Sequence, residues 1–72
     1  MKEIELIKEP TELYKILKFE GLVASGGEAK IVISKGYVLV NGQIETRKRK
    51  KIVSGDTIEL GGEIFKMRLI EK

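Results

Sequence analysis

The sequence predicts an α+β fold in which two helices pack on one side of a small, mainly antiparallel sheet. Apolar residues recur with helical spacing at 11–20 and 28–35, whereas most of the remaining chain shows the period of two that is typical of strands. Asn41-Gly42 also predicts a two-residue hairpin turn, because both turn positions need positive φ. The 72 residues are expected to form one domain, 1–72, with a modest core.

A strand and a helix are expected first. Residues 2–8 begin by alternating apolar and charged side chains, which predicts a short strand. Residues 11–20 carry one apolar stripe, so we expect a helix that ends at Gly21, a residue suited to the left-handed position after a helix. The buried stripe of this helix should consist of Leu13, Ile16 and Leu17.

The second helix has a clear start signal. Ser25 is followed three residues later by Glu28, which is the spacing of a capping box with Ser25 as the N-cap. An apolar linker at 22–24, which should be buried, precedes this helix. We expect the helix to run to about Lys35 and to stop at Gly36. Its buried stripe should consist of Ala29, Val32 and Ile33.

The hairpin leaves the orientation of its side chains open. A two-residue turn places Leu39 opposite Ile44, and we expect these two side chains to face the core while Val38 and Val40 point to the other side. Either both faces of the sheet are partly covered, or a bulge shifts the register. The returning strand should cover 43–46.

Two further strands are expected near the C-terminal end. Alternating apolar residues predict strands at 57–60 and along 65–69. Glycine-rich turns precede and separate them, at 54–56 and at Gly61-Gly62.

Positive charge is concentrated in one part of the chain. The net charge is +3, but residues 29–54 hold seven Lys or Arg against one acid, which is +6, and the remaining residues hold seven bases against ten acids, which is −3. Five cations form the unbroken run 47–51, in which strand alternation would point odd and even positions to opposite sides. Such a patch suggests a polyanion, most often nucleic acid. The alternative is a run that is only solvated.

The start of the second helix is a second candidate for anion binding. Free N–H groups and the positive end of the helix dipole attract phosphate. Gly26 and Gly27 each cost roughly 1 kcal/mol of helix stability relative to Ala, but they leave room for a nucleic-acid backbone. Lys30 lies one turn further along the second helix. Lys15 and Lys18 of the first helix would contribute to this anion site only if that helix lies beside the start of the second. The alternative is a tight turn that needs no ligand.

The chain lacks the residues that several classes of protein function need. Without Cys there is no disulfide or thiolate metal site, and without His the chain lacks the usual general base and the commonest metal ligand. We therefore expect no cofactor, no metal and no catalysis. No apolar run reaches transmembrane length and the first residues lack a signal-peptide core, so the expectation is a cytoplasmic monomer without membrane contact.

Four segments in order carry a resemblance to a known family: Ser-Gly-Gly-Glu-Ala-Lys at 25–30, Gly-Tyr-Val-Leu-Val-Asn-Gly at 36–42, Glu-Thr-Arg-Lys-Arg-Lys-Lys-Ile at 45–52 and Gly-Asp at 55–56. Together they resemble the RNA-binding domain first described in small-subunit ribosomal protein S-four. The stand-alone bacterial subfamily, YaaA-like, is the most similar, and the resemblance covers about residues 11–60.

This resemblance implies a non-catalytic protein that binds structured ribosomal RNA, or ribosomal particles, in ribosome assembly. It places these residues on the RNA face: Lys18, Ser25, Gly26, Lys30, Asn41, Gln43, Arg47, Lys48, Arg49, Lys50 and Lys51. The helix argument adds Lys15 and Gly27. The broader family often has Ser-Arg at the second helix start and Arg near position 30, so contact here should rely more on backbone N–H groups.

Two other functions compete with RNA binding. One is a protein-interaction module whose basic loop meets an acidic partner. The other is a small β-grasp sulfur carrier, which residues 40–42 and 55–59 resemble weakly. A carrier needs Gly-Gly as its free C-terminus, whereas Gly61-Gly62 is followed by ten residues, and this argues against it.

Overall fold

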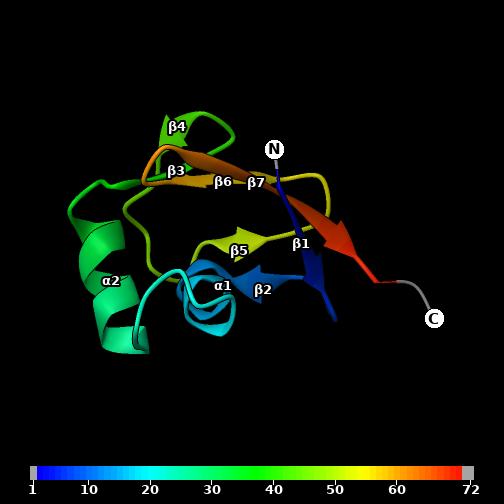
Figure 1. Cartoon of the computed structure of the whole chain (residues 1–72), viewed down its shortest axis with the longest axis horizontal. Helices are drawn as coiled ribbons and strands as arrows, with labels where there is room; N and C mark the ends of the chain where they lie inside the picture. Colours follow the sequence, from blue (N-terminus) through cyan, green and yellow to red (C-terminus); the bar gives the residue numbers. More distant parts are fainter. Residues whose placement is uncertain (1, 71–72) are drawn as a thin grey trace.

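Two helices lie beneath a five-stranded sheet in the computed structural model, which describes residues 2–70 (Figure 1). This arrangement confirms the predicted α+β fold. The elements are β1 (Lys2–Leu6), β2 (Thr11–Glu12), α1 (Leu13–Phe19), α2 (Gly26–Ser34), β3 (Val38–Val40), β4 (Gln43–Ile44), β5 (Lys51–Ile52), β6 (Thr57–Leu60) and β7 (Glu63–Leu69). Neither helix within 2–70 is long and apolar enough to cross a membrane.

The sheet is antiparallel except at one edge. Its strand order is β1-β7-β6-β3-β4, and only the pair of β1 with β7 is parallel. Gly61 and Gly62 form the tight turn between β6 and β7, both with positive φ. A separate two-stranded ladder joins β2 to β5.

The core lies between the helices and the lower face of the sheet. The predicted stripe of α1 is fully confirmed, because its three side chains are at most 2% exposed. In α2, Ala29 and Ile33 are buried and Val32 is partly buried against them. The linker is only partly buried, since Val23 lies in the core but Ala24 is exposed.

The boundaries of the helices follow the predicted capping chemistry. Ser25 is the N-cap of α2, and its Oγ accepts the N–H of Glu28 at 3.1 Å. The Glu28 carboxylate reaches back to the N–H of Ala24, one residue before the usual capping-box partner. Gly21 and Gly36 follow the two helices with φ of 70° and 79°, as the C′ residues of Schellman motifs.

The hairpin has the register of a plain two-residue turn, one of the two alternatives that the sequence leaves open, but its side chains have the opposite orientation to the one expected. Leu39 pairs with Ile44 across a turn in which both residues have positive φ, so no bulge shifts the strands. Val38 and Val40 are buried, however, whereas Ile44 is 65% exposed, so the predicted core face was wrong. Strand alternation defines two faces without saying which one the helices cover. Here β6 places Ile58, which is fully buried, opposite Val40 and thereby selects the face.

The start of the first helix also differs from the prediction. Thr11 and Glu12 are extended and form β2, and α1 begins only at Leu13. These two residues pair with β5, which is about forty residues away in the chain, so local periodicity could not reveal the strand. The returning strand β4 is likewise shorter than expected, and the chain leaves it before Glu45.

Candidate nucleic-acid interface

The basic run is a turn bound to the first helix rather than an extended strand. The carbonyl of Lys50 accepts the N–H of Leu13 at 2.9 Å, and the carbonyl of Lys48 accepts the N–H of Tyr14 at 3.1 Å. A further bond, from the N–H of Lys50 to the carbonyl of Arg47 at 3.2 Å, closes the turn itself. The alternation expected for an extended run is therefore wrong.

This arrangement solves a problem at the start of α1. The first N–H groups of a helix have no partner within it, and the N-cap residue Glu12 makes no side-chain hydrogen bond to them. The carbonyls of the run act as the cap instead. The β2–β5 pair continues the attachment, with Thr11 opposite Ile52 and Glu12 opposite Lys51, and Ile52 is fully buried. The backbone of the run is thus bound on one side, while all of its residues except the half-buried Lys50 are exposed to solvent.

Cations from three elements meet around one aromatic ring. The Nζ of Lys30, on α2, lies 4.9 Å from the centroid of the Tyr14 ring. The Nζ of Lys15, on α1, and the guanidinium carbon of Arg49, in the basic run, each lie 6.0 Å from the same centroid. The structure therefore brings Lys15, Lys30 and the run together, as the sequence hypothesis required.

Tyr14 was not among the residues selected from the sequence. Two other aromatic side chains, Phe19 and Tyr37, are more exposed, at 70% and 59%, and would be the obvious candidates for stacking on a base. Nothing in the local sequence distinguishes Tyr14, because its cationic neighbours Lys30 and Arg49 are far away in the chain. Only the spatial approach of α2 and the run to α1 identifies it.

Glu12 supplies the negative charge in this cluster. Its carboxylate lies 3.2 Å from the Nζ of Lys15 and 4.0 Å from a terminal nitrogen of Arg49. Exposed pairs of this kind contribute little stability, roughly 0–1 kcal/mol. One carboxylate among three cations leaves the cluster with a net positive charge.

The two helices also meet at the predicted anion site. The side chain of Lys18 lies beside the start of α2, and its Cδ is 3.8 Å from the position that a Cβ on Gly26 would take. Among residues 2–70, no acceptor is recorded for the N–H groups of Gly26 and Gly27, while that of Glu28 is bonded to Ser25. Lys18 therefore accompanies two free backbone donors.

Arg47 is already engaged by an acid of its own loop. The Glu45 carboxylate accepts hydrogen bonds from Nε of Arg47 at 2.9 Å, from its Nη2 at 3.1 Å and from its backbone N–H at 3.1 Å. Bonding by the Arg47 side chain lowers the pKa of Glu45, and the same bond raises the pKa of Arg47. Arg47 thus shapes the loop, and two of its guanidinium nitrogens, Nε and Nη2, are occupied by Glu45.

The remaining predicted residues lie in different surroundings. Asn41 uses both ends of its amide within the fold, because Nδ2 donates to Asp56 at 3.0 Å and Oδ1 accepts the N–H of Thr57 at 2.9 Å. This gives Asn41 a structural role in joining the hairpin to β6. Gln43 is exposed on the edge strand β4, and Lys51 is exposed at the start of β5.

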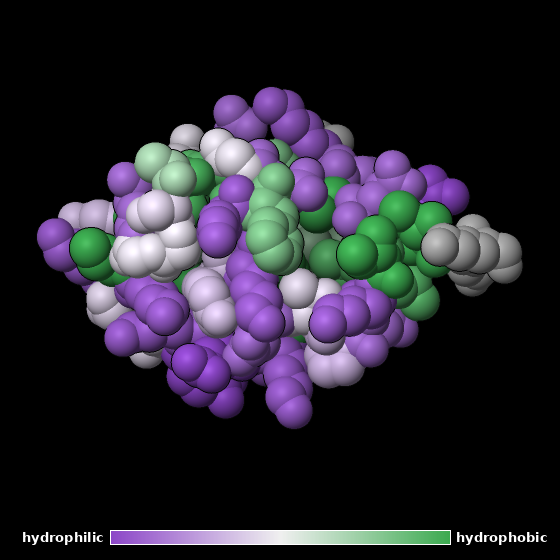
Figure 2. Space-filling view, turned by 90° about the horizontal axis from the view of Figure 1, so that it is seen from below, coloured by the Kyte–Doolittle hydropathy of each residue, from purple (hydrophilic) through white to green (hydrophobic). Residues whose placement is uncertain are grey.

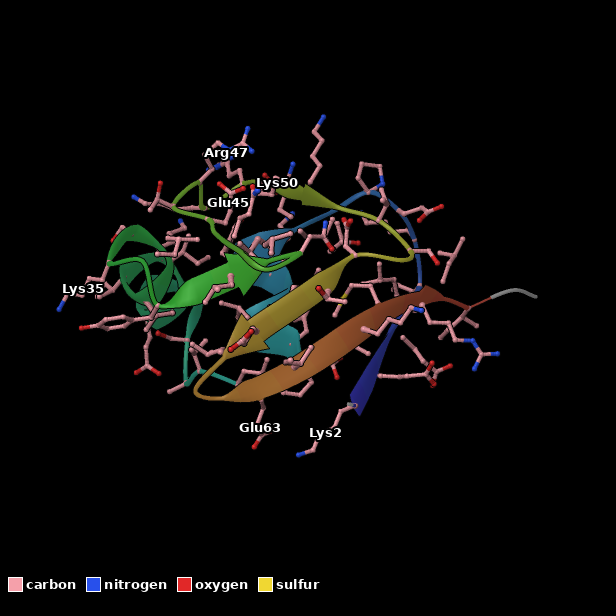
Figure 3. The ribbon with its side chains drawn as sticks, turned by 90° about the horizontal axis from the view of Figure 1, so that it is seen from above. Lys2, Lys35, Glu45, Arg47, Lys50 and Glu63 are labelled. Atoms are coloured by element: carbon pink, nitrogen blue, oxygen red, sulfur yellow. The ribbon has the colours of Figure 1, made fainter. Side chains whose placement is uncertain are left out.

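The basic loop occupies one side of the molecule. Figure 3 shows Arg47, Glu45 and Lys50 together at one edge of the fold, with Lys2 and Glu63 at the opposite edge, where they form a 2.9 Å ion pair. Lys35, at the end of α2, lies apart from both groups (Figure 3). The exposed charges are therefore divided between separate regions.

An apolar groove adjoins the basic region at Lys15. It runs between β1 and α1 and is lined in part by Ile7, Ile16 and Phe19. The surface seen from below is largely hydrophilic, with hydrophobic side chains gathered at the end near the C-terminus (Figure 2). The lining of the groove is mainly apolar, whereas a polyanion needs cations and hydrogen-bond donors, so the basic region is the stronger candidate for a nucleic-acid site.

Comparison with known proteins supports the family suggested by the sequence. The sequence model of the S4 domain matches residues 4–68. The chain belongs to the S4 domain family. It is 49% identical over 63 residues to YbcJ from Escherichia coli strain K12, a match that covers 86% of this chain and 90% of the relative. It is also 36% identical over 59 residues to the "Probable ribosome maturation protein RlbA" of Bacillus subtilis strain 168, covering 82% and 83%.

The fold agrees with a solved structure of the same family. The solution structure of YbcJ from E. coli matches with a TM-score of 0.71 and 45% identity, covering 94% of this chain and 87% of that one. That structure is described as revealing an ALFAL motif involved in RNA-binding. The sulfur-carrier alternative is contradicted, because Gly61 and Gly62 form an internal turn of an S4 domain.

The Glu45–Arg47 pair predicts a pH dependence of stability. Because the folded-state pKa of Glu45 is below its unfolded value of about 4.3, the unfolded chain binds more protons in this range, and the contribution is lost as the pH falls through the folded pKa. The difference in unfolding free energy between wild type and Glu45→Gln should be present near pH 6 and should shrink below about pH 4. Urea titrations at several pH values measure it, and Glu63→Gln at the opposite edge serves as control. A difference that is independent of pH would contradict the assignment.

Proposed function

We propose that this protein is a non-catalytic RNA-binding protein that holds the phosphate backbone of structured ribosomal RNA during ribosome maturation. The observation that carries the proposal is the attachment of the basic run to α1, which brings Arg49 of the run and Lys30 of α2 to the same Tyr14 ring. A surface with cations from three elements and free helix donors suits a polyanion.

The relatives support the two parts of this proposal. The YbcJ protein of the solved structure is 45% identical to this chain, and its structure is described as having a motif involved in RNA-binding. The B. subtilis relative is named as a probable ribosome maturation protein. These similarities cover most of each chain, so the comparison extends over the whole domain. A partner that is both an RNA and part of the ribosome, which is ribosomal RNA, agrees with both names.

The proposed surface consists of three parts. The first is the start of α2 with the side chain of Lys18, where backbone donors can bind phosphate. The second is the cluster around Tyr14, and the third is the outer side of the basic run. The residues of this surface are Lys15, Lys18, Ser25, Gly26, Gly27, Lys30, Arg47, Lys48, Arg49, Lys50 and Lys51. Phosphate contacts of this kind give affinity with little sequence preference, so shape must select the RNA.

Asn41 and Gln43 have a smaller part in this proposal. The amide of Asn41 is bonded at both ends, so a contact with RNA would have to replace a bond to Asp56 or Thr57. Gln43 is exposed two residues before the loop that carries the cations, and it is proposed only as a contact at the edge of the surface.

The first test concerns the charge of the basic run. Replacing Arg47, Lys48, Arg49 and Lys50 together with Ala should weaken binding to ribosomal RNA fragments and flatten its salt dependence by roughly one unit of slope per lost phosphate contact. Lys30→Ala should have the same effect on a smaller scale. Binding is measured at several salt concentrations after folding of each variant has been checked.

Lys66→Ala is the matched control for these variants. Lys66 is exposed on β7, between the buried Phe65 and Met67, and so it points to the face of the sheet opposite the helices. This variant should keep wild-type affinity and slope. If the four-Ala variant also kept both, the basic run would be only a solvated loop and the proposed function would lose its main support. Binding to an acidic protein without binding to RNA would favour the protein-interaction alternative.

The second test separates folding from binding at the start of α2. Gly26 and Gly27 do not have positive φ, and a Cβ on either would meet only ordinary contacts at 3.8 Å, so the fold does not require glycine there. Gly26→Ala and Gly27→Ala should therefore stabilise the protein by up to roughly 1 kcal/mol. If RNA approaches the backbone closely, the same variants should bind more weakly. Unchanged RNA affinity in both variants would remove the helix start from the surface.

A further inference from the structure

The cations around Tyr14 form an arrangement that the interactions between charged side chains alone do not favour. Lys15, Lys30 and Arg49 come from three different elements, yet their charged groups lie within 6.0 Å of one ring centroid. Like charges at short separation repel each other, and the Glu12 carboxylate lies beside only Lys15 and Arg49 of the three. Solvent screens part of this repulsion, and an attraction to a further group would offset more of it.

The Tyr14 ring provides that interaction. An aromatic ring has a negative face, and a cation within about 6 Å of its centroid is attracted to it. Lys30, at 4.9 Å, is the closest of the three, and Arg49 lies at 6.0 Å. Long cationic side chains lose conformational freedom when they bind, so a ring that restricts them beforehand lowers the entropic cost of binding.

The fold itself holds the ring in place. The backbone N–H of Tyr14 is bonded to the carbonyl of Lys48, and the side chain packs, partly buried, against the hydrophobic core. One residue is thus attached to the basic run through its backbone and to the cations of α2 and the run through its ring. Lys30 over the ring also competes with any base that would stack there, so Tyr14 acts through the cations.

We propose that Tyr14 is a positioning residue of the RNA site, which holds the ammonium of Lys30 and the guanidinium of Arg49 over its ring so that both meet one phosphodiester of the RNA backbone. This inference rests on the proposed function and assigns a role to a residue outside the basic run and the helix start. Its ligand chemistry is a backbone phosphate, and its specific feature is the aromatic ring beneath the two cations.

The first experiment needs no RNA. If the Lys30 side chain lies over the ring, its Cε protons should be shifted upfield by the ring current in NMR spectra of the free protein. Tyr14→Phe should keep this shift, and Tyr14→Leu should abolish it. Protons of Lys35, the C-cap residue of α2, whose ammonium is not among the cations over the Tyr14 ring, are the internal control. A Lys30 signal that is the same in wild type and Tyr14→Leu would overturn the proposal.

The second experiment measures coupling in binding to a ribosomal RNA fragment. Tyr14→Leu should weaken binding about three- to tenfold, while Tyr14→Phe should remain close to wild type. The effects of Tyr14→Leu and Lys30→Ala should be less than additive in a double-mutant cycle, because both remove the same interaction. The cycle of Tyr14→Leu with Lys35→Ala should be additive. Tyr14→Met is a second apolar variant in case Tyr14→Leu lowers stability.

The outcomes distinguish this inference from the proposed function. If wild type binds RNA and both apolar variants bind equally well, or if Tyr14→Phe binds as weakly as Tyr14→Leu, the positioning role is overturned while the RNA function stands. If wild type has no measurable affinity for the RNA, the proposed function fails, and this inference fails with it even where the ring-current shift is present.

Discussion

The hydrogen bonds between the first turn of α1 and the carbonyls of the basic run are the constraint on which the site depends. Leu13 and Tyr14 need acceptors, and the carbonyls of Lys50 and Lys48 provide them. Because these bonds use only backbone atoms, they fix the position of the run without neutralising any of its side chains. The two-residue ladder of β2 with β5 then connects the end of the run to the buried Ile52. A helix cap and a phosphate-binding surface are thus made by the same segment.

This constraint has an electrostatic cost, which the surroundings partly offset. Five consecutive cations repel one another, and the bonds to α1 keep them close to two further lysines on the helices. Glu45 engages Arg47 at one end of the run, and Glu12 lies beside Lys15 and Arg49 near α1. Both carboxylates are partly exposed, so the remaining positive charge stays available to a polyanion and its binding should be sensitive to salt.

The sequence predicted what depends on local patterns. Both helices, the N-cap at Ser25, the glycine stops and the two-residue turn at Asn41-Gly42 follow from short-range rules, and the structure confirms them. Three features depend on distant partners and were missed or wrong. They are the β2–β5 ladder, the core face of β3, and the cluster at Tyr14. Each is set by an element far away in the chain, which periodicity within a window does not detect.

The most direct test of one continuous RNA surface is a titration of the isotope-labelled protein with a ribosomal RNA fragment, followed through backbone amide shifts. The account predicts that the largest shift changes occur in 14–18, 25–30 and 47–51. These changes should saturate at the same RNA-to-protein ratio and give the same apparent dissociation constant. Ile64 and Lys66, on the opposite face of the sheet, should change little. Changes centred on that face, or confined to the basic run while the amides of α2 stay unchanged, would contradict it.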